Sequence, residues 1–560
     1  MTPARTRPTR TSAPRMTEYA SERRTFGLHP PERFNAVIGI VDAWAVDEPD
    51  APAVLSVAGD GEPVALQTAA DLARAAGEAA RALLELGVAQ GDRVFVMLPH
   101  GPTWYAALLG CMRIGAVPMP GPNLLTPKDI AYRVGRGGAR VAITDANGAA
   151  KVDASGAVLD VKLCGGGGGA RAGWLDFGER CARAGGDPLP ADPTHRDDPL
   201  LLYFTSGTVS EPKMVEHVQS YALGHVGTAR FWHDLRPGDR HWTVADTGWA
   251  KAAWGGLFGQ FHERACVVQV ALGRPDADTV LGIVARHGVT SFCAPPTLYR
   301  MLVQGDFSRH DLSSLRHCTS AGEPLNPEVI RAWEDGTGLT IHDGYGQTET
   351  TCLVANYRSV PVRQGSMGRP MPGWDVVVVD DGGSPVGAGV VGNVAVRCEP
   401  NHPIGLFRGY EGDAEATARV FRAGLYFTGD KAAVDPDGYL WFEGRDDDVI
   451  TSSAYRIGPF EVESALIEHP AVTETAVVGR DDPDRTQVVV GVCVLANGYG
   501  PSDALARELQ DHVKQTTAPY KYPREIHFVD ELPKTVSGKI RRSELRAWLH
   551  AGRLSAREGR

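Results

Sequence analysis

The sequence predicts an α/β fold: a large N-terminal domain of helix-covered β-sheets with a β-rich subdomain, and a small α+β C-terminal domain. From about residue 30 to 445, short β-branched runs alternate with longer helical stretches, which is typical of parallel sheets covered by helices. After residue 375 the pattern changes to shorter strands, and beyond Gly444 a compact α+β pattern begins. The 560 residues are enough for two or more such domains.

In the N-terminal region, Arg93–Leu98 is a predicted strand and Thr103–Ile114 is the helix that follows it. The other strands predicted here are Arg140–Thr144, Leu200–Phe204, His241–Ala245, Cys266–Val270 and Ser291–Ala294. Amphipathic segments between some of these strands are predicted helices, among them Asp278–His287 and Thr297–Gln304.

Val376–Asp380 and Val390–Arg397 are predicted strands of a more antiparallel unit. The elements predicted after it are helix Phe460–His469, strands Val472–Val478 and Val488–Leu495, and helix Ala504–Lys514. About a hundred residues is a normal domain size. The predicted division is a disordered leader over 1–25, an N-terminal domain over 26–446, a C-terminal domain over 447–550 and a tail over 551–560.

Composition excludes several classes of protein. The formal net charge of -11 argues against nucleic acid as a partner, because a phosphate backbone needs a basic face. No apolar run is long enough to span a bilayer. The arginine-rich N-terminus lacks an apolar segment, so it is not a secretory signal. A disordered leader is predicted here in preference to a transit peptide or a basic arm. The nine cysteines form no Cys-x-x-Cys pair, which favours reduced thiols and a cytoplasmic location.

The segment Tyr203–Lys213 follows an apolar strand and is rich in hydroxyl groups. Its backbone N–H groups and hydroxyls can surround a triphosphate, and Lys213 adds positive charge. The Walker A pattern is absent. Taken alone, the segment fits an ordinary Ser/Thr-rich turn equally well.

Further motifs follow in order along the chain: Ala321–Leu325, Asp343–Glu349, Tyr426–Asp430, Gly444–Asp447 and Pro533–Lys539. Together with Tyr203–Lys213, this set resembles the adenylate-forming superfamily of acyl-CoA synthetases, peptide-synthetase adenylation domains and luciferases. The closest likeness is to medium-chain acyl-CoA synthetases, through Asp246–Trp249, Tyr455–Pro459 and Ala518–Pro523. The resemblance implies an ATP-dependent enzyme that joins a carboxylic acid to AMP, releases pyrophosphate, and passes the acyl group to coenzyme A.

The resemblance also implies roles for single residues. Thr348 would bond the α-phosphate, Glu349 would hold Mg²⁺, and Lys539 would reach the substrate carboxylate and the α-phosphate. Asp447 would be the hinge of a mobile C-terminal lid that delivers Lys539 and then swings away. The predicted ATP-binding residues are Thr205, Ser206, Gly207, Thr208, Lys213, Gly322, Glu323, Pro324, Asp343, Tyr345, Gln347, Asp430 and Arg445. Singly, Asp430 fits a turn residue, Lys539 a solvated lysine and Tyr345 plain core packing.

The acid pocket is predicted around Trp249, with Lys251, Gly255, Ala294 and Thr297 as further contributors. Small residues at Gly255 and Gly256 would leave room for an acid longer than acetate; Trp249 also fits simple core burial.

The acceptor tunnel is predicted at Ala454, Tyr455 and Arg456. Glycine is usual in relatives at position 454, so the added methyl group bears on the thioester step. Val209 and Ser210 likewise depart from the usual phosphate loop.

The leading hypothesis is an acyl-CoA synthetase for a medium-chain, branched or aromatic acid, using ATP, Mg²⁺ and coenzyme A. A second hypothesis keeps the adenylate but sends it to a carrier-protein thiol, to an amine, or to nitrite activation for diazotisation. A third is a catalytically silent nucleotide-binding homologue. The predicted partners are a small-molecule acid, a carrier protein under the second hypothesis, and a second copy in a homodimer.

Overall fold

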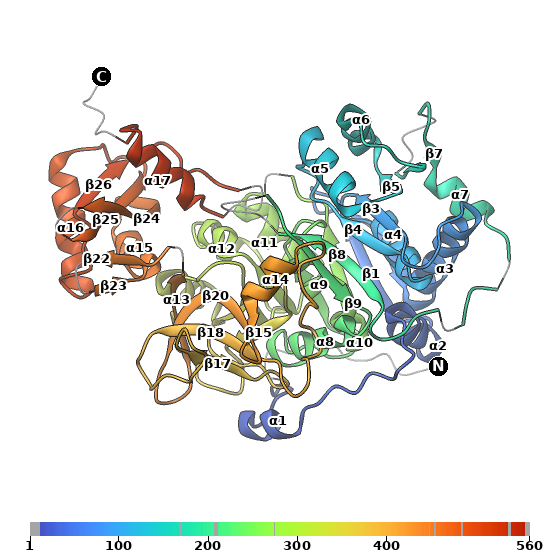
Figure 1. The fold of residues 1–560 in the computed structure, drawn as a ribbon, viewed down its shortest axis with the longest axis horizontal. Helices are drawn as coiled ribbons and strands as arrows, with labels where there is room; N and C mark the ends of the chain where they lie inside the picture. Colours follow the sequence, from blue (N-terminus) through green and yellow to red (C-terminus); the bar gives the residue numbers. More distant parts are fainter. Residues whose placement is uncertain are drawn as a thin grey trace.

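The computed structural model describes residues 12–166, 171–186, 188–191, 193–205, 211–273, 275–446, 448–452, 455–482, 485–535 and 539–554. Two sheets with parallel cores form the large domain, a smaller antiparallel sheet adjoins them, and the C-terminal domain lies to one side (Figure 1). The α/β fold with a large N-terminal and a small C-terminal domain is confirmed.

The first sheet of the large domain has nine strands. Its order is β16 (Arg369–Pro370), β15 (Cys352–Ala355), β14 (Ile341–Gly346), β13 (His317–Ser320), β12 (Ser291–Ala294), β10 (Arg240–Thr243), β11 (Cys266–Val270), β1 (Pro52–Val57) and β2 (Pro63–Thr68). The six strands from β14 to β1 pair in parallel, and the outer strands pair antiparallel. Strands β11 and β12 have the predicted bounds.

The second sheet of the large domain is entirely parallel. Its order is β4 (Val117–Pro120), β3 (Arg93–Met97), β5 (Val141–Thr144), β6 (Val161–Cys164) and β7 (Leu175–Asp176). A separate antiparallel hairpin, β8 (Pro199–Phe204) and β9 (Met214–Val218), flanks the phosphate-loop motif. Strand β3 is buried except at its first residue, because a parallel strand between helices faces apolar neighbours on both sides.

Helices surround these sheets. Those before β8 are α1 (Tyr19–Thr25), η1 (Val37–Asp42), α2 (Ala43–Asp47), α3 (Ala69–Glu85), α4 (Pro102–Arg113), α5 (Pro127–Gly137), α6 (Ala146–Ser155) and α7 (Phe177–Arg183). Those after β9 are α8 (Tyr221–Gly227), η2 (Thr228–Trp232), α9 (Ala250–Gly256), α10 (Phe258–His262), α11 (Ala277–Arg286), α12 (Pro296–Leu302), η3 (Phe307–Arg309) and α13 (Pro327–Thr337). Thr68 and Thr126 begin α3 and α5 with capping boxes, which satisfy N–H groups that a helix leaves free at its start.

The β-rich subdomain is the predicted antiparallel unit. Its strands are β17 (Val376–Val379), β18 (Gly392–Arg397), β19 (Phe421–Arg422), β20 (Leu425–Val434) and β21 (Leu440–Arg445), and helix α14 (Ala414–Val420) precedes β19. In the β20–β21 register, Asp430 lies opposite Arg445. The pairing therefore brings together two residues that the sequence assigns to the nucleotide.

The C-terminal domain has a five-stranded sheet. Its strands are β22 (Ile450–Ser452), β23 (Tyr455–Ile457), β24 (Val472–Asp482), β25 (Thr486–Leu495) and β26 (Glu525–Phe528), and its helices are α15 (Pro459–Glu468), α16 (Asp503–Thr516) and α17 (Arg542–His550). Two hydrophobic clusters form its core, one on each face of the β24–β25 pair. Asp447 lies outside the described residues, so the predicted boundary at Asp446–Asp447 stays a prediction.

The N-terminal leader differs from the prediction of disorder over 1–25, in the part from residue 12 that the structure describes. Met16 is 1% exposed, and the Arg15 side chain pairs with Glu263 at 2.9 Å. Helix α1 follows, and its Tyr19 hydroxyl donates to the Pro370 carbonyl at 2.8 Å. Composition missed this because the partners of the segment lie more than two hundred residues away in the chain.

Two smaller findings concern the end of the chain and membranes. Leu554, in the predicted tail, is buried in the C-terminal core. Among the described residues, every helix is too short or too polar to cross a bilayer.

Candidate active site

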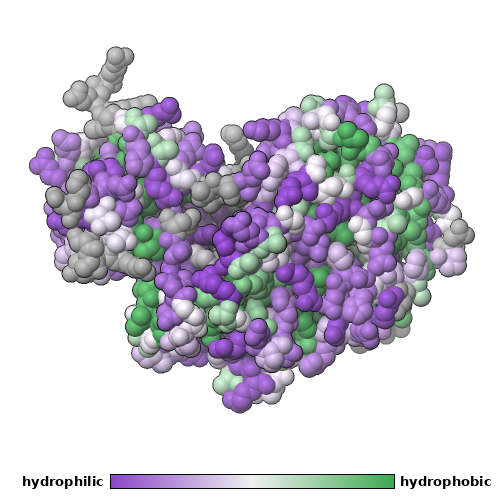
Figure 2. Space-filling view, in the orientation of Figure 1, coloured by the Kyte–Doolittle hydropathy of each residue, from purple (hydrophilic) through white to green (hydrophobic). Residues whose placement is uncertain are grey.

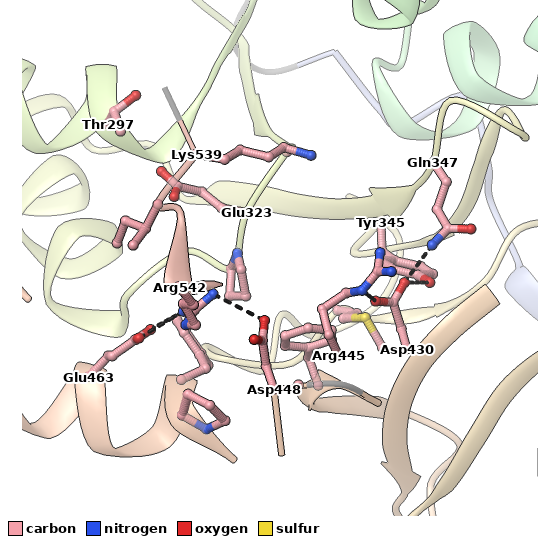
Figure 3. Close-up of a pocket in the computed structure, with 18 of the residues that line it drawn as sticks. Thr297, Glu323, Tyr345, Gln347, Asp430, Arg445, Asp448, Glu463, Lys539 and Arg542 are labelled. Atoms are coloured by element: carbon pink, nitrogen blue, oxygen red, sulfur yellow. Dashed lines mark hydrogen bonds and ion pairs between the residues drawn. The ribbon is translucent and has the colours of Figure 1, made fainter. Parts of the chain in front are cut away.

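The predicted site residues converge on a cleft of about 540 Å³ between the C-terminal domain and the rest of the chain. Figure 2 shows the hollow between these two parts, bordered by hydrophilic side chains. Residues on β14, β20 and β21 form one wall, and residues around α15 and α17 form the other (Figure 3). The predicted residues in the lining are Thr205, Lys213, Thr297, Gly322, Glu323, Pro324, Asp343, Tyr345, Gln347, Thr348, Glu349, Asp430, Arg445 and Lys539.

The two ends of the phosphate loop are tied together. The Thr205 N–H donates to the Lys213 carbonyl, and the Lys213 N–H donates to the Thr205 hydroxyl, both at 3.0 Å. The predicted phosphate ligands Ser206, Gly207 and Thr208 lie outside the described residues. The closed base of the loop directs Thr205 and Lys213 into the cleft.

Thr348 and Glu349 follow β14, and two buried side chains hold them. His217 donates through Nε2 to the Thr348 carbonyl at 2.7 Å, and burial lowers the pKa of His217 to about 3, so its ring is neutral. The Tyr410 hydroxyl donates to Glu349 Oε1 at 2.8 Å. Burial raises the pKa of Glu349, and the bond from Tyr410 opposes that shift by stabilising the carboxylate.

Asp430 is the centre of a hydrogen-bonded group in the cleft (Figure 3). It is 4% exposed, and its Oδ2 accepts from the Tyr345 hydroxyl at 2.5 Å and from Gln347 Nε2 at 2.7 Å. Arg445 Nε lies 3.7 Å from Oδ1. Asp430 is therefore more than a turn residue, and Tyr345 is oriented by a polar bond as well as by packing.

The segment after β13 contributes Gly322, Glu323 and Pro324 to the lining of the cleft. Gly322 has a φ of +117°, which favours glycine, and Glu323 next to it pairs with Arg300 of α12 at 3.1 Å. Burial raises the pKa of Asp343 to about 8, against the hydrogen bond that it accepts from the Gly344 N–H at 3.1 Å. The side chain can thus accept or donate a hydrogen bond near neutral pH.

Lys539 enters the cleft from the C-terminal domain (Figure 3). Hydrogen bonds join Thr535 to Lys539 at 2.7 and 3.1 Å and fix the loop ends, while Val536, Ser537 and Gly538 lie outside the described residues. The side chain is exposed in the cleft, but the surrounding protein lowers the pKa of Lys539 by desolvation, against the attraction of Asp430 and Glu323. Lys539, Asp430 and Glu323 line the same cleft, which favours a role in the site over that of a lysine in bulk solvent.

A partly buried group of ion pairs, not predicted from the sequence, anchors the segment after Lys539. Arg542, the first residue of α17, donates to both oxygens of Glu463 at 2.7 and 2.9 Å. Arg546, one turn further, donates to Asp448 at 2.8 Å. These bonds join the segment after Lys539 to the residue that follows the predicted hinge, so the C-terminal domain holds Lys539 in a fixed frame.

Of the predicted acid-pocket residues, only Thr297 lines this cleft. Lys251 Nζ donates to the Ala321 carbonyl at 2.7 Å instead of facing solvent, and burial lowers the pKa of Lys251. The expectation that Gly255 leaves room for substrate is wrong in this structure. A Cβ at Gly255 would lie 1.9 Å from Thr243 Oγ1, because α9 packs tightly on β10.

The carboxyl end of β14 is covered by two tryptophans that the sequence analysis did not select. A Cβ at Gly344 would lie 2.4 Å from the Trp232 ring, and one at Gly346 would lie 2.4 Å from the Trp254 ring. The two rings meet edge to face, with centroids 6.3 Å apart. They form an aromatic wall behind the strand that carries Tyr345, and the paired glycines in Gly344-Tyr345-Gly346 were the signal for this close approach.

The remaining predicted residues whose side chains the structure describes are absent from the lining of this cleft. Trp249 caps the start of α9 and is partly exposed, while Ala294 is buried at the end of β12. Tyr455 and Arg456 lie in β23, but Asp447 and Ala454 lie outside the described residues. The hinge and the acceptor tunnel thus stay predictions.

The donors in the cleft suit a magnesium ion that is shared with a nucleotide. The described residues contain no group of three or more His, Cys, Asp or Glu side chains that could hold a metal ion by themselves. Mg²⁺ is commonly held by one or two carboxylates together with substrate phosphates. Glu349 supplies such a carboxylate, and Tyr410 fixes one of its oxygens.

Comparison with known proteins agrees with the geometry. Residues 41–411 match the sequence profile of the AMP-binding enzymes, and residues 461–539 match that of the AMP-binding enzyme C-terminal domain. The mouse mitochondrial acyl-coenzyme A synthetase ACSM3 is 43% identical over 96% of this chain and 94% of its own length. The human mitochondrial acyl-coenzyme A synthetase ACSM5 is 45% identical over 92% of this chain and 91% of its own.

Solved structures show the same fold. The anthranilate CoA ligase AuaEII in complex with anthranoyl-AMP superposes with a TM-score of 0.84 at 32% identity, covering 93% of this chain and 99% of that one. A benzoate CoA ligase from Burkholderia xenovorans superposes with a TM-score of 0.80 at 28% identity, covering 92% of this chain and 100% of that one. Both span the large and the small domain.

The predicted cytoplasmic location is contradicted by these relatives. The ACSM3 and ACSM5 proteins are named as mitochondrial, and this finding overturns the cytoplasmic prediction. Cysteine usage was the basis of the prediction, and reduced thiols do not distinguish the cytoplasm from other reducing compartments.

Proposed function

The chain belongs to the AMP-binding enzyme family, and we propose that it activates a medium-chain, branched or aromatic carboxylic acid with ATP and forms its coenzyme A thioester. The observation that carries the proposal is the convergence of Lys539, Thr348, Glu349 and Asp430 on one cleft. These residues come from two domains and from segments almost two hundred residues apart. A binding protein would not need a lysine delivered by a separate domain.

The first half-reaction is attack of a carboxylate oxygen on the α-phosphorus of ATP. A P–O bond to the acid forms as the bond to pyrophosphate breaks. Two anions must approach each other, so positioning and charge neutralisation supply most of the rate. Lys539 supplies a positive charge in the cleft, where it can offset the negative charge of the two anions.

The nucleotide is bound by side chains that hydrogen bonds within the protein already hold in place. Asp430 accepts the ribose hydroxyl hydrogen bonds, and Tyr345 and Gln347 fix its carboxylate before ATP arrives. Lys213 and Thr205 contact the β- and γ-phosphates from the closed base of their loop. Glu349 would hold Mg²⁺, and the bound ion would neutralise phosphate charge.

The second half-reaction is attack of the coenzyme A thiol on the acyl carbon, with AMP as the leaving group. Lys539 is not needed there, so the C-terminal domain is free to move about the hinge predicted at Asp447. Such a lid separates two chemistries that use one site. The 2.8 Å bond from Arg546 to Asp448 ties the segment after the predicted hinge to α17.

The class of acid is inferred from the names of the relatives. One neighbour is named an anthranilate and another a benzoate CoA ligase. A homodimer and a carrier-protein partner stay predictions of the family resemblance.

The test is pyrophosphate release from ATP and Mg²⁺ with a panel of acetate, hexanoate, octanoate, 2-methylbutyrate, benzoate and anthranilate. Each acid is run with and without coenzyme A. We expect turnover with one class of acid that rises when coenzyme A is added, and thioester in equal amount to AMP. Pyrophosphate release at the same rate with and without coenzyme A would contradict the thioester step but would still support adenylation. No release with any acid would contradict both steps.

A further inference from the structure

We propose that Tyr410 is a positioning residue that holds Lys213 and Glu349 apart and aims both at the phosphates of ATP. Tyr410 is 8% exposed and lines the cleft beside Glu349. The proposal deepens the proposed function, because it rests on Glu349 as the magnesium ligand and Lys213 as a phosphate ligand.

The Tyr410 side chain contacts both residues at once. Its hydroxyl donates to Glu349 Oε1 at 2.8 Å, and the Lys213 ammonium lies 4.6 Å from the centroid of its ring. A cation over the face of an aromatic ring is attracted to it. Lys213 and Glu349 carry opposite charges, yet no ion pair joins them among the described residues. The ring therefore contacts the Lys213 ammonium and the hydroxyl binds the Glu349 carboxylate. Because the two charged groups do not pair with each other, both stay available to the nucleotide.

The backbone fixes Tyr410 in this place. Val215 on β9 forms a bridge with Tyr410, and the Glu411 N–H donates to the Met214 carbonyl at 2.9 Å. On the other side, the Phe407 N–H donates to the Glu349 carbonyl at 2.9 Å. The segment 407–411 is thus bonded to the phosphate-loop hairpin and to the metal carboxylate's own backbone.

The Tyr410 N–H donates to the Thr417 hydroxyl of α14 at 2.9 Å, which fixes the segment from behind. Gly409 precedes Tyr410 with a φ of +156°, and a Cβ there would lie 2.8 Å from Thr417. The tight turn leaves the tyrosine little freedom to move away from Glu349. A residue held by three elements around one phosphate site fits positioning better than surface packing.

Two variants separate the two contacts. Tyr410→Phe removes the hydroxyl but keeps the ring beneath Lys213, and Tyr410→Leu removes both. Tyr357→Phe is the matched control, because Tyr357 is also buried, its hydroxyl donates to the Arg369 carbonyl at 3.1 Å, and neither residue lines the cleft. Binding of ATP is measured by calorimetry in EDTA and in excess Mg²⁺, and pyrophosphate release is measured against Mg²⁺ concentration.

For Tyr410→Phe we expect ATP affinity in EDTA to match wild type, while affinity in Mg²⁺ falls about tenfold, as for a lost hydrogen bond to a charged group. The Mg²⁺ concentration for half-maximal release should rise by a similar factor. Tyr410→Leu should also weaken ATP binding in EDTA several-fold, because Lys213 is no longer held. Tyr357→Phe should behave as wild type in every measurement.

A double-mutant cycle tests whether the effect passes through Glu349. Adding Tyr410→Phe to Glu349→Gln should cause no further loss of Mg²⁺-dependent ATP binding. Additive losses, equal losses with and without Mg²⁺, or wild-type behaviour of Tyr410→Phe would each overturn the proposal. If the wild type binds ATP with Mg²⁺ but releases no pyrophosphate with any acid, the proposed function fails, while the binding measurements still decide the role of Tyr410.

Discussion

Replacing Gly255 by alanine tests whether this glycine serves packing, as the structure indicates, or substrate room, as its sequence suggested. The new Cβ would lie 1.9 Å from Thr243 Oγ1 and 2.2 Å from Thr243 Cβ. Overpacking of this kind costs about 1–3 kcal/mol. Displacing the Thr243 hydroxyl also breaks its 2.8 Å bond with His241 Nε2, which adds about 1 kcal/mol.

Gly256→Ala is the matched control, since its nearest contact would be the Tyr105 hydroxyl at an ordinary 3.7 Å. Both glycines lie in α9, so the helical gain from alanine, about 1 kcal/mol, is common to the two variants. Gly255→Ala should therefore be less stable than Gly256→Ala by about 2–4 kcal/mol in urea unfolding, with an unchanged order of preference among acids. Equal stabilities, together with a shift of Gly255→Ala toward shorter acids, would refute the packing account.

Three further predictions concern charge. Asp430→Asn should raise the KM for ATP about tenfold or more in pyrophosphate-release assays, because the ribose loses a charged acceptor, and an unchanged KM would contradict the ribose role. Burial keeps His217, His225 and His241 neutral with pKa values of about 3, whereas the unfolded chain binds protons below a pH of about 6.5. Stability should therefore fall as the pH drops from about 6.5 toward 3, by about 1.4 kcal/mol per pH unit for each histidine; a flat urea midpoint between pH 7 and 5 would contradict this. The lowered pKa of Lys539 predicts that pyrophosphate release declines with rising pH below the range of an ordinary lysine, and that Lys539→Arg moves the decline upward; identical profiles would refute the assignment.

Much of the fold could be predicted from local pattern. Strands β11 and β12 have the predicted bounds, because each is a short buried apolar run between turns. The leader was mispredicted because its contacts, such as Tyr19 with Pro370, are long-range. A single sequence shows which segments are strands but not which distant residues they bring together.

The site shows the same limit. Asp430 and Arg445 were selected from motifs, and the β20–β21 register brings them together. Tyr410 and Arg542 were missed, although Gly409 and Gly412, on the two sides of Tyr410, marked a tight turn. Their roles come from contacts with Glu349 and Glu463, which spacing in the chain does not reveal.

The central claim is that Lys539 serves adenylation alone, and separating the two half-reactions tests it most directly. Wild type and Lys539→Ala are compared in acid-dependent exchange of pyrophosphate into ATP, and in thioester formation from supplied acyl-AMP and coenzyme A. We predict that the variant loses exchange by at least about a hundredfold, as for loss of a preorganised charge, and keeps thioester formation near wild type. Full exchange in the variant, or equal loss of both half-reactions, would contradict the account.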